Sequence, residues 1–237
     1  MLLVIFSSIP RIFTSSFKNI NREEGRLTAD YIYTPYGETV LHNKNGHYEC
    51  SLNHALLFKS PDTELVQETV HMSMLQYPWA EKILVVGGNR TLVEELLRYP
   101  NIKNIYWSAI VPGSFDFISV SGIDTKLPPP DIRLRKIKKS DPRDFIRDIS
   151  GGSIFDVAIV NVPDPVNIFF NRYYSYDFFI NLRSIMSDYS IISFDLSAPE
   201  EFDGVEKKIL FSSVYNSAKD VFPNTLEMEG ARIQVLA

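Results

Sequence analysis

Residues 82–100 read KILVVGGNRTLVEELLRYP, and this stretch predicts how the rest of the chain is arranged. The apolar run at 83–86 ends in Gly87-Gly88, which is typical of a buried strand followed by a tight turn. The next residues place their apolar side chains on one helical face: Leu92, Val93, Leu96 and Leu97. A strand, a glycine turn and a helix form the first unit of a doubly wound α/β sheet, and ligands bind beyond the carboxyl ends of such strands. The turn is therefore where a nucleotide would lie.

The composition indicates an ordinary globular protein. The chain has 237 residues, of which 45% are hydrophobic and 22% charged, with a formal net charge of -5. This negative charge argues against nucleic acid as the main partner, because phosphate-binding surfaces carry excess Lys and Arg. The basic cluster at 133–139 alternates with apolar residues, so a strand with one solvated face is favoured over a polyanion site.

Cysteine and histidine usage points to no metal and no disulfide framework. Cys50 is the only cysteine, and the four histidines show no metal-binding spacing. A reducing, cytoplasmic location is the default expectation. The apolar run at 2–6 is much shorter than the roughly 20 residues that span a bilayer, and it lacks the basic start of a signal peptide. It is either a docked arm or the end of a membrane segment in a longer parent protein.

Turn signals divide the chain into four parts. They are an N-terminal arm (1–26), a small antiparallel β domain (27–59), a linking helix (60–78) and a Rossmann-like α/β domain (79–237). Strands of the β domain are predicted at 29–33, 38–42, 47–51 and 55–58, with a hairpin at Asn45-Gly46. The linking helix is predicted to start with Ser60 as N-cap and Pro61 in its first position.

The α/β domain is predicted to alternate strands and helices and to end in an antiparallel pair. Further strands are expected at 102–110, 133–137, 155–162 and 190–196, and helices at 141–149, 176–187 and 204–221. Any helix within 111–131 is expected to be short or broken, because that stretch contains two glycines and three consecutive prolines. The closing pair is expected at 224–229 and 231–236.

Four segments resemble the spermidine synthases, which are aminopropyltransferases. Residues 54–88 (HALLFKSPDTELVQETVHMSMLQYPWAEKILVVGG) resemble the family's β-hairpin, gate helix and glycine-rich strand end. Residues 156–165 (DVAIVNVPDP) are similar to the family's Asp-Val-Ile-Ile-Val-Asp-x-x-Asp-Pro. Residues 140–147 (SDPRDFIR) and 171–179 (NRYYSYDFF) look like the helix starts on either side of that strand.

The resemblance covers roughly residues 30–236 and is closest to a bacterial branch in which this domain follows membrane helices. It implies a class I methyltransferase-like fold and a homodimer formed through the β domain. In the family, decarboxylated S-adenosylmethionine donates an aminopropyl group to a polyamine, and methylthioadenosine leaves. Such a site needs a nucleotide cradle, an acid for the ribose, anionic groups for the diamine and a base for the amine proton.

The nucleotide side of the implied site is altered. Gly87, Gly88 and Asn89 occupy the cradle, which is one residue shorter than the family's and lacks its acid. The resemblance, aligned at Pro112, puts Ala109 at the position of the ribose-binding Glu, with Val111 at that of the following Asp. Alanine cannot accept hydrogen bonds from two hydroxyls, and this argues against tight nucleoside binding. The turn either binds a ligand or contains glycine for steric reasons alone, and the sequence favours neither interpretation.

The remaining site residues each have two interpretations. Asp141 matches the position beside the adenine amino group, but a helix N-cap before Pro142 is favoured. Asn161 replaces the family's first Asp and cannot accept a proton at neutral pH. Asp164 is retained and could bind an ammonium or accept a proton, although a turn residue between two prolines is slightly favoured. Tyr173 and Tyr174 match the aromatic pair of the amine pocket, and can equally be core residues.

The substrate gate is also changed. Positions that are acidic or Tyr-His in the family read Leu65, Val66 and Gln67 here, and Asp62 is the one acid that aligns with a family acid. A dication would therefore find little pairing charge along this helix.

The substitutions leave three hypotheses open. The first is a spermidine synthase-like protein with a degenerate donor site and a binding or structural role. The second is a divergent but active aminopropyltransferase that uses Asp164, with decarboxylated S-adenosylmethionine or methylthioadenosine as its adenosyl ligand. The third is an S-adenosylmethionine-dependent methyltransferase, against which the N-terminal β domain and the lost ribose acid both count.

Overall fold

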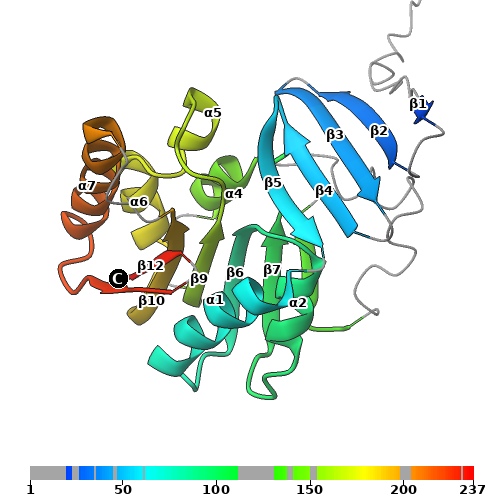
Figure 1. The fold of residues 1–237 in the computed structure, drawn as a ribbon. Coiled ribbons are helices and arrows are strands. Elements are labelled where there is room, and N and C mark those ends of the chain that lie inside the picture. The colour runs from blue at the N-terminus through cyan, green and yellow to red at the C-terminus, as the bar shows by residue number, and fades with distance from the viewer. Residues whose placement is uncertain are drawn as a thin grey trace, which may run out of the picture.

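Two β-sheets organise the protein (Figure 1). The computed structural model describes residues 20–22, 27–34, 36–44, 47–60, 62–111, 131–137, 141–149, 154–197, 204–230 and 232–237. A five-stranded sheet precedes a seven-stranded sheet along the chain, and a single helix, α1 (Thr63–Gln76), joins the two. This arrangement confirms the predicted fold class, a Rossmann-like α/β domain with a small antiparallel domain before it.

The first sheet is a meander of neighbouring antiparallel strands. Its members are β1 (Ile20–Arg22), β2 (Leu27–Thr34), β3 (Gly37–Lys44), β4 (His47–Leu52) and β5 (Ala55–Ser60). Lys44 pairs with His47, the spacing expected for the predicted hairpin, whose residues 45–46 lie outside the described ones. The prediction that residues 1–26 form an arm is wrong at 20–22, because β1 pairs with β2. Its three residues are too few to show a periodic pattern.

Helix α1 starts later than predicted. Its N-cap is Asp62 rather than Ser60, and the helix begins at Thr63. Ser60 is instead the last residue of β5, where it pairs with Tyr48. The ladder of the first sheet therefore holds the backbone of Ser60 extended, so the local capping signal is overridden by a strand partner.

The second sheet has the order β11-β12-β10-β9-β6-β7-β8. Its strands are β6 (Lys82–Gly87), β7 (Asn104–Ser108), β8 (Leu134–Ile137), β9 (Phe155–Asn161), β10 (Met186–Leu196), β11 (Leu226–Met228) and β12 (Ile233–Leu236). The strands from β10 to β8 in this order are parallel, whereas β12 is antiparallel to both of its neighbours. The order reverses between β6 and β9, which places a ligand crevice at their carboxyl ends.

Helices cover both faces of this sheet (Figure 1). They are α2 (Arg90–Leu97), α4 (Pro142–Asp148), α5 (Ile168–Asn171), α6 (Tyr176–Arg183) and α7 (Val205–Lys219). In β6, Ile83 and Val85 pack with α1 and α2, whereas Leu84 and Val86 pack with α4, α6 and α7. This alternation is why the run at 83–86 is apolar throughout.

Two of these helices, α5 and α6, differ from the sequence predictions. The predicted helix at 176–187 ends at Arg183, because Met186 already pairs with Phe155 as the start of β10. The short helix α5 was not predicted. The expectation of a short or broken helix at 111–131 falls mostly outside the described residues. No helix in the described ranges is long and apolar enough to cross a membrane.

The turn from β6 to α2 requires glycine. Gly87 and Gly88 have φ values of 78° and 68°, in the left-handed region. A Cβ on Gly87 would lie 2.3 Å from the backbone oxygen of Asn161. The amide of Gly88 donates to that same oxygen over 2.9 Å. The turn thus holds the carboxyl ends of β6 and β9 together.

We expect Gly87→Ala to lower the free energy of unfolding by about 3 kcal/mol or more, since it combines a left-handed φ with a backbone clash. Gly204→Ala is the matched control. Gly204 caps α7 with a φ of -59°, and a Cβ there meets only the end of the flexible Glu206 side chain. The control should cost about 1 kcal/mol or less. Urea unfolding measures both, and equal losses would contradict the role assigned to the turn.

Candidate functional site

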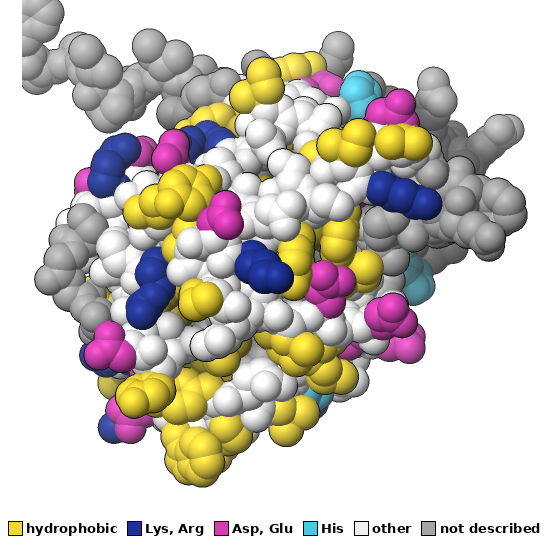
Figure 2. Space-filling view, turned by 90° about the vertical axis from the view of Figure 1, so that its left-hand side faces the viewer, with side chains coloured by type: hydrophobic (Ala, Val, Ile, Leu, Met, Phe, Trp, Pro, Cys, Tyr) yellow, Lys and Arg dark blue, Asp and Glu magenta, His cyan; other side chains and the backbone are white. Residues whose placement is uncertain are grey.

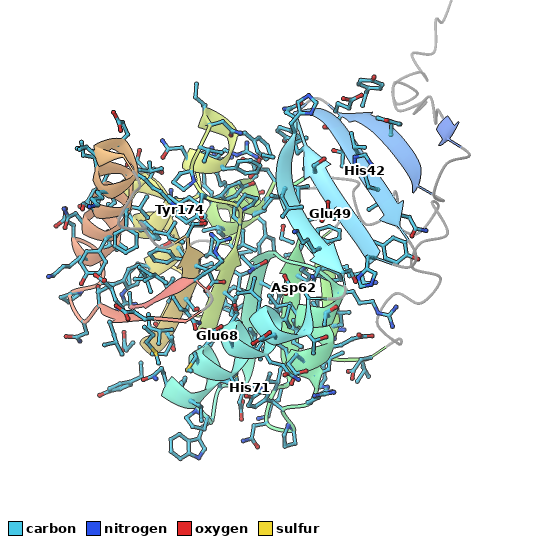
Figure 3. All side chains as sticks on the ribbon, viewed as in Figure 1. His42, Glu49, Asp62, Glu68, His71 and Tyr174 are labelled. Carbon is cyan, nitrogen blue, oxygen red and sulfur yellow. The ribbon has the colours of Figure 1, made fainter. Side chains whose placement is uncertain are left out.

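A cavity of about 620 Å³ lies between β5, α1 and the carboxyl ends of β9 and β10. Its charged lining residues come from all of these elements and from the residue before β12: Lys59, Asp62, Asp164, Asp195 and Arg232. Figure 3 shows Asp62 at the junction between the first sheet and α1. The cavity therefore exists only because the two sheets and α1 meet at the predicted ligand edge.

Asp164 lines this cavity with its charge already paired. One carboxylate oxygen, Oδ1, accepts from the Ser197 amide over 3.1 Å and forms an ion pair with Nη2 of Arg232. The same Nη2 donates to the backbone oxygen of Asp195 over 3.2 Å. The backbone oxygen of Asp164 accepts from the Val166 amide at 2.7 Å, so the residue is also part of a turn.

Asp195 is a site residue that the sequence analysis missed. Its side chain is 4% exposed, and Oδ2 accepts from Thr69 Oγ1 at 3.0 Å and from Asn161 Nδ2 at 3.3 Å. Burial raises the pKa of this carboxyl, while the nearby Arg232 charge and the two hydrogen bonds oppose that rise. The available signal was a single acid at the end of the apolar run IISFDL.

Asn161 suits a position beside a buried carboxylate. Its amide donates to Asp195, whereas an aspartate there would place a second carboxylate within hydrogen-bond distance of the first. Two carboxylates that close cannot both ionise without a large cost. The acid that the resemblance implies at position 161 is thus absent, and the carboxylate beside Asn161 in the cavity is that of Asp195, on the neighbouring strand.

The gate helix presents only part of the predicted residues to the cavity. Asp62 lines the cavity together with Leu65, Val66 and Thr69, which share one helical face with it. Asp62 is the N-cap of α1, yet its side chain makes no capping hydrogen bond. Gln67, the other predicted gate residue, is not among the lining residues, because its position points away from that face.

The groups of the glycine cradle are already hydrogen-bonded within the protein. The backbone oxygen of Gly87 accepts from the Trp107 indole at 2.8 Å. Asn89 caps α2 by accepting from the Leu92 amide at 3.0 Å, and its Nδ2 donates to the Lys59 backbone oxygen at 3.0 Å. The Asn89 side chain therefore links the first sheet to the start of α2, through its Nδ2 and Oδ1 atoms respectively.

The end of β7 is apolar where it faces this turn. Ala109, Ile110 and Val111 are 8%, 5% and 1% exposed. The Cγ2 atom of Ile110 lies 3.4 Å from the place that a Cβ on Gly87 would take. Positions 109–111 thus offer no side-chain acceptor to a ribose.

Asp141 is a helix N-cap, as favoured by the sequence, and its carboxylate has further partners. It is the N-cap of α4 and accepts from the Arg143 amide at 2.9 Å. It also pairs with Arg172 Nη2 at 2.9 Å and accepts from the Tyr173 hydroxyl at 3.4 Å. The Arg172 guanidinium in turn lies 4.1 Å from the centre of the Phe169 ring. The buried carboxylate is therefore satisfied without a ligand.

Tyr174 packs behind the site rather than in it. Its hydroxyl donates to the Val162 backbone oxygen at 2.6 Å, and its ring contacts Phe194 edge-on. Figure 3 shows it apart from Asp62, among the elements on the α6 side of β9. Burial raises the pKa of Tyr174, which keeps the hydroxyl protonated. It holds the backbone just before Asp164.

The basic cluster predicted as a strand forms β8, at the edge of the second sheet. Arg133 pairs with Asp131 at 2.8 Å and donates to the Leu97 backbone oxygen at 2.9 Å, so it fastens the end of α2 to the sheet. Lys138 and Lys139 lie outside the described residues. On the face seen in Figure 2, basic and acidic side chains are interspersed, without an extended basic area among the coloured residues.

We expect Asp195→Asn to change how stability depends on pH. Because the pKa of Asp195 is raised in the folded state, its protonated form favours folding, and this contribution is lost as the pH rises through the folded-state pKa. The variant lacks this loss, so its stability relative to wild type should increase from pH 4 to pH 8. Urea unfolding across this range is the measurement.

The matched control for that experiment is Asp188→Asn, an exposed aspartate on the same strand. Its stability difference from wild type should stay nearly constant with pH. A flat profile for Asp195→Asn as well would show that the Asp195 carboxyl is not destabilised by burial.

Comparison with curated proteins finds polyamine aminopropyltransferases. The chain is 28% identical over 182 residues to the polyamine aminopropyltransferase of Leptospira interrogans, covering 75% of this chain and 36% of that protein. It is 25% identical over 200 residues to polyamine aminopropyltransferase 2 of Ralstonia nicotianae, covering 79% and 38%. The chain thus spans little more than a third of the length of these relatives. No family model matches it.

Solved structures with the same fold include a spermidine synthase in complex with the transition state analogue AdoDATO. That structure has a TM-score of 0.69 at 14% identity and covers 87% of this chain and 71% of its own. The spermidine synthase from Thermotoga maritima has a TM-score of 0.64 at 13% identity, with 93% and 71% covered. Human methyltransferase-like protein 13 in complex with SAH has 0.53 at 16% identity, with 73% and 78% covered.

The sequence relatives and the shared two-sheet fold agree with the motifs at 54–88 and 156–165. The chain is therefore similar in sequence to curated polyamine aminopropyltransferases and has the fold of the spermidine synthases.

Proposed function

We propose that this chain is a spermidine synthase-like protein with a degenerate donor site, which binds a small cationic ligand and transfers aminopropyl groups weakly or not at all. One observation carries the proposal. The end of β7, where the resemblance implies a carboxylate for the ribose, presents buried apolar side chains at Ala109 and Val111.

The energetic consequence of this change is large. A hydroxyl that loses its hydrogen-bond partner on burial costs about 1–3 kcal/mol. A difference of about 1.4 kcal/mol is tenfold in affinity. A ribose has two hydroxyls to satisfy in such a site, so an adenosyl ligand bound against Ala109 is weakened by orders of magnitude.

Two further features support the proposal. The Gly87 oxygen and the Asn89 amide, both in the cradle, already have partners within the protein. Asn161 stands where the resemblance implies a base, and an amide cannot accept the amine proton at neutral pH. What remains beside it is a cavity with carboxylates at Asp62 and Asp195, which suits a ligand of the amine class.

A divergent, active aminopropyltransferase is the second candidate, and Asp195 favours it. This carboxylate lines the cavity next to Asn161, and burial raises its pKa towards the range in which a general base is effective. A methyltransferase shares the fold, as the likeness to human methyltransferase-like protein 13 illustrates. The apolar end of β7 weakens S-adenosylmethionine binding just as it weakens binding of the decarboxylated form.

We expect no thermal shift with methylthioadenosine, decarboxylated S-adenosylmethionine or S-adenosylmethionine at 1 mM. A ligand present at 100 times its Kd stabilises the folded state by about 2.7 kcal/mol. For a chain of this size, that corresponds to about 5–10 °C in melting temperature. A shift of this size with either of the first two ligands would overturn the degenerate-site proposal and favour the active enzyme.

Restoring the acid tests whether its loss is the cause. Ala109→Glu should produce a measurable shift with methylthioadenosine, because a carboxylate can accept from both ribose hydroxyls. Ala109→Gln, which has the same length without the charge, is the matched control and should give a smaller shift or none. Circular dichroism verifies that both variants are folded. Equal shifts for the two variants would speak against a role for the lost charge.

The homodimer implied by the resemblance stays part of this proposal, with the first sheet as its interface. Light scattering on the purified chain tests it, and a monomeric mass at micromolar concentration would contradict it.

A further inference from the structure

We propose that Arg232 is a specificity-determining residue of the cavity, whose guanidinium takes Asp164 out of ligand binding and so restricts the cavity to ligands with one positive charge. The inference rests on the proposed function in one respect, that the ligand is an amine. It follows from the charges that line the cavity and from their partners.

The cavity has five charged lining residues, and three of them are compensated within the protein. Arg232 pairs with Asp164. The Lys59 ammonium pairs with Glu49 at 3.3 Å, on the outer part of the first sheet. The carboxylate that remains for a ligand is that of Asp62, whose side chain makes no capping bond. Asp195 is buried, and its Oδ2 already accepts from Thr69 and Asn161. Without Arg232 the same wall would carry one more unpaired negative charge.

The Arg232–Asp164 pair is difficult for a ligand to displace. The two side chains are only 26% and 24% exposed, so separating them leaves partly buried charges without partners. The guanidinium is tethered by its own chain, whereas a free amine must lose translational freedom to take its place. The Ser197 amide and the backbone oxygen of Asp195 hold the two charged groups in position.

The guanidinium also repels a second ammonium group. Two like charges repel each other more strongly in a partly buried cavity than in bulk water, because solvent screens them less there. A diamine that places one ammonium at Asp62 would have its other one without a free carboxylate, in a cavity that also holds the Arg232 guanidinium. A monoamine avoids this repulsion, and its alkyl part can contact the apolar lining at Leu65 and Val66.

The position of Arg232 indicates more than a structural tie. Its Nε atom is buried without a hydrogen-bond partner among the described residues. A guanidinium placed only to fasten the end of β12 would be expected to use this donor, because leaving it unmade is costly. Its Nη2 atom instead sits between the Asp164 carboxylate and the Asp195 backbone, at the cavity wall.

Isothermal titration calorimetry with propylamine, putrescine and spermidine on wild type and on Arg232→Met tests the inference. Methionine fills similar space without charge and leaves Asp164 free for an ammonium. We expect the variant to bind putrescine at least tenfold more tightly than wild type, with a change of less than about threefold for propylamine. Arg232→Lys, which keeps the charge, should bind putrescine as weakly as wild type.

The double variant Arg232→Met/Asp164→Asn removes the freed carboxylate and should return putrescine affinity to the wild-type level. A folded Arg232→Met protein that binds putrescine no better than wild type overturns the inference. Circular dichroism establishes folding. If Arg232→Met does not fold, Asp164→Asn replaces it, because it leaves Arg232 unbalanced and should weaken propylamine binding about tenfold. Unchanged propylamine binding would then overturn the inference.

The outcomes separate this inference from the proposed function. If no variant binds any of the three amines, the cavity is not an amine site and the inference fails, while the degenerate donor site is still decided by the adenosyl ligands. If wild type binds methylthioadenosine and Arg232→Met still gains putrescine affinity, the donor-site proposal fails and the inference stands.

Discussion

The hydrogen bond from the Gly88 amide to the Asn161 oxygen is the contact on which the site depends. It closes β6 against β9 at the edge where the sheet order reverses. The two neighbouring side chains extend this contact outward, since Asn89 reaches Lys59 in the first sheet and Asn161 reaches Asp195 on β10. Only glycine at position 87 allows so close an approach of the two backbones. A local steric requirement thus fixes the relative position of both sheets and of the cavity between them.

Two internal arginines give the site its present electrostatic character. Asp141 and Asp164 are the retained acids that the resemblance links with ligand groups, and each is paired with an arginine of this chain, Arg172 and Arg232 respectively. A buried carboxylate needs a donor, and either a ligand or the protein can supply it. Here the protein does so at both positions. These two retained acids are therefore a poor guide to ligand binding. Asp62 and Asp195, for which the described residues supply no ion pair, are more informative.

The architecture could be predicted from the sequence because its signals are local. The apolar runs of β6 and β9 and the amphipathic face of α2 each appear within fewer than ten consecutive residues. The predicted ends of helices were wrong where pairing with a residue distant in the sequence determined the secondary structure. Ser60 is held in β5 by its ladder with β4, and Met186 joins β10 through its pairing with Phe155. The N-cap role of Asp141 is observed, together with a salt bridge to Arg172 that no local pattern indicated, whereas its contact with an adenine stays a prediction.

The sequence by itself indicated the likeness to the aminopropyltransferases, the order of the elements and the apolar residue at position 109, because each depends on residue identity and spacing along the chain. Only the tertiary structure decided which charges meet. Arg232 and Asp164 are 68 positions apart, and Thr69 and Asp195 are 126 apart, yet both pairs share one cavity wall. The pairing of charges depends on their distance in space, because the interaction energy weakens as the charges separate. This pairing produces no periodic pattern in the sequence. For that reason the strands and turns that form the site can be predicted from the sequence, whereas the pairing of its charges depends on the tertiary structure.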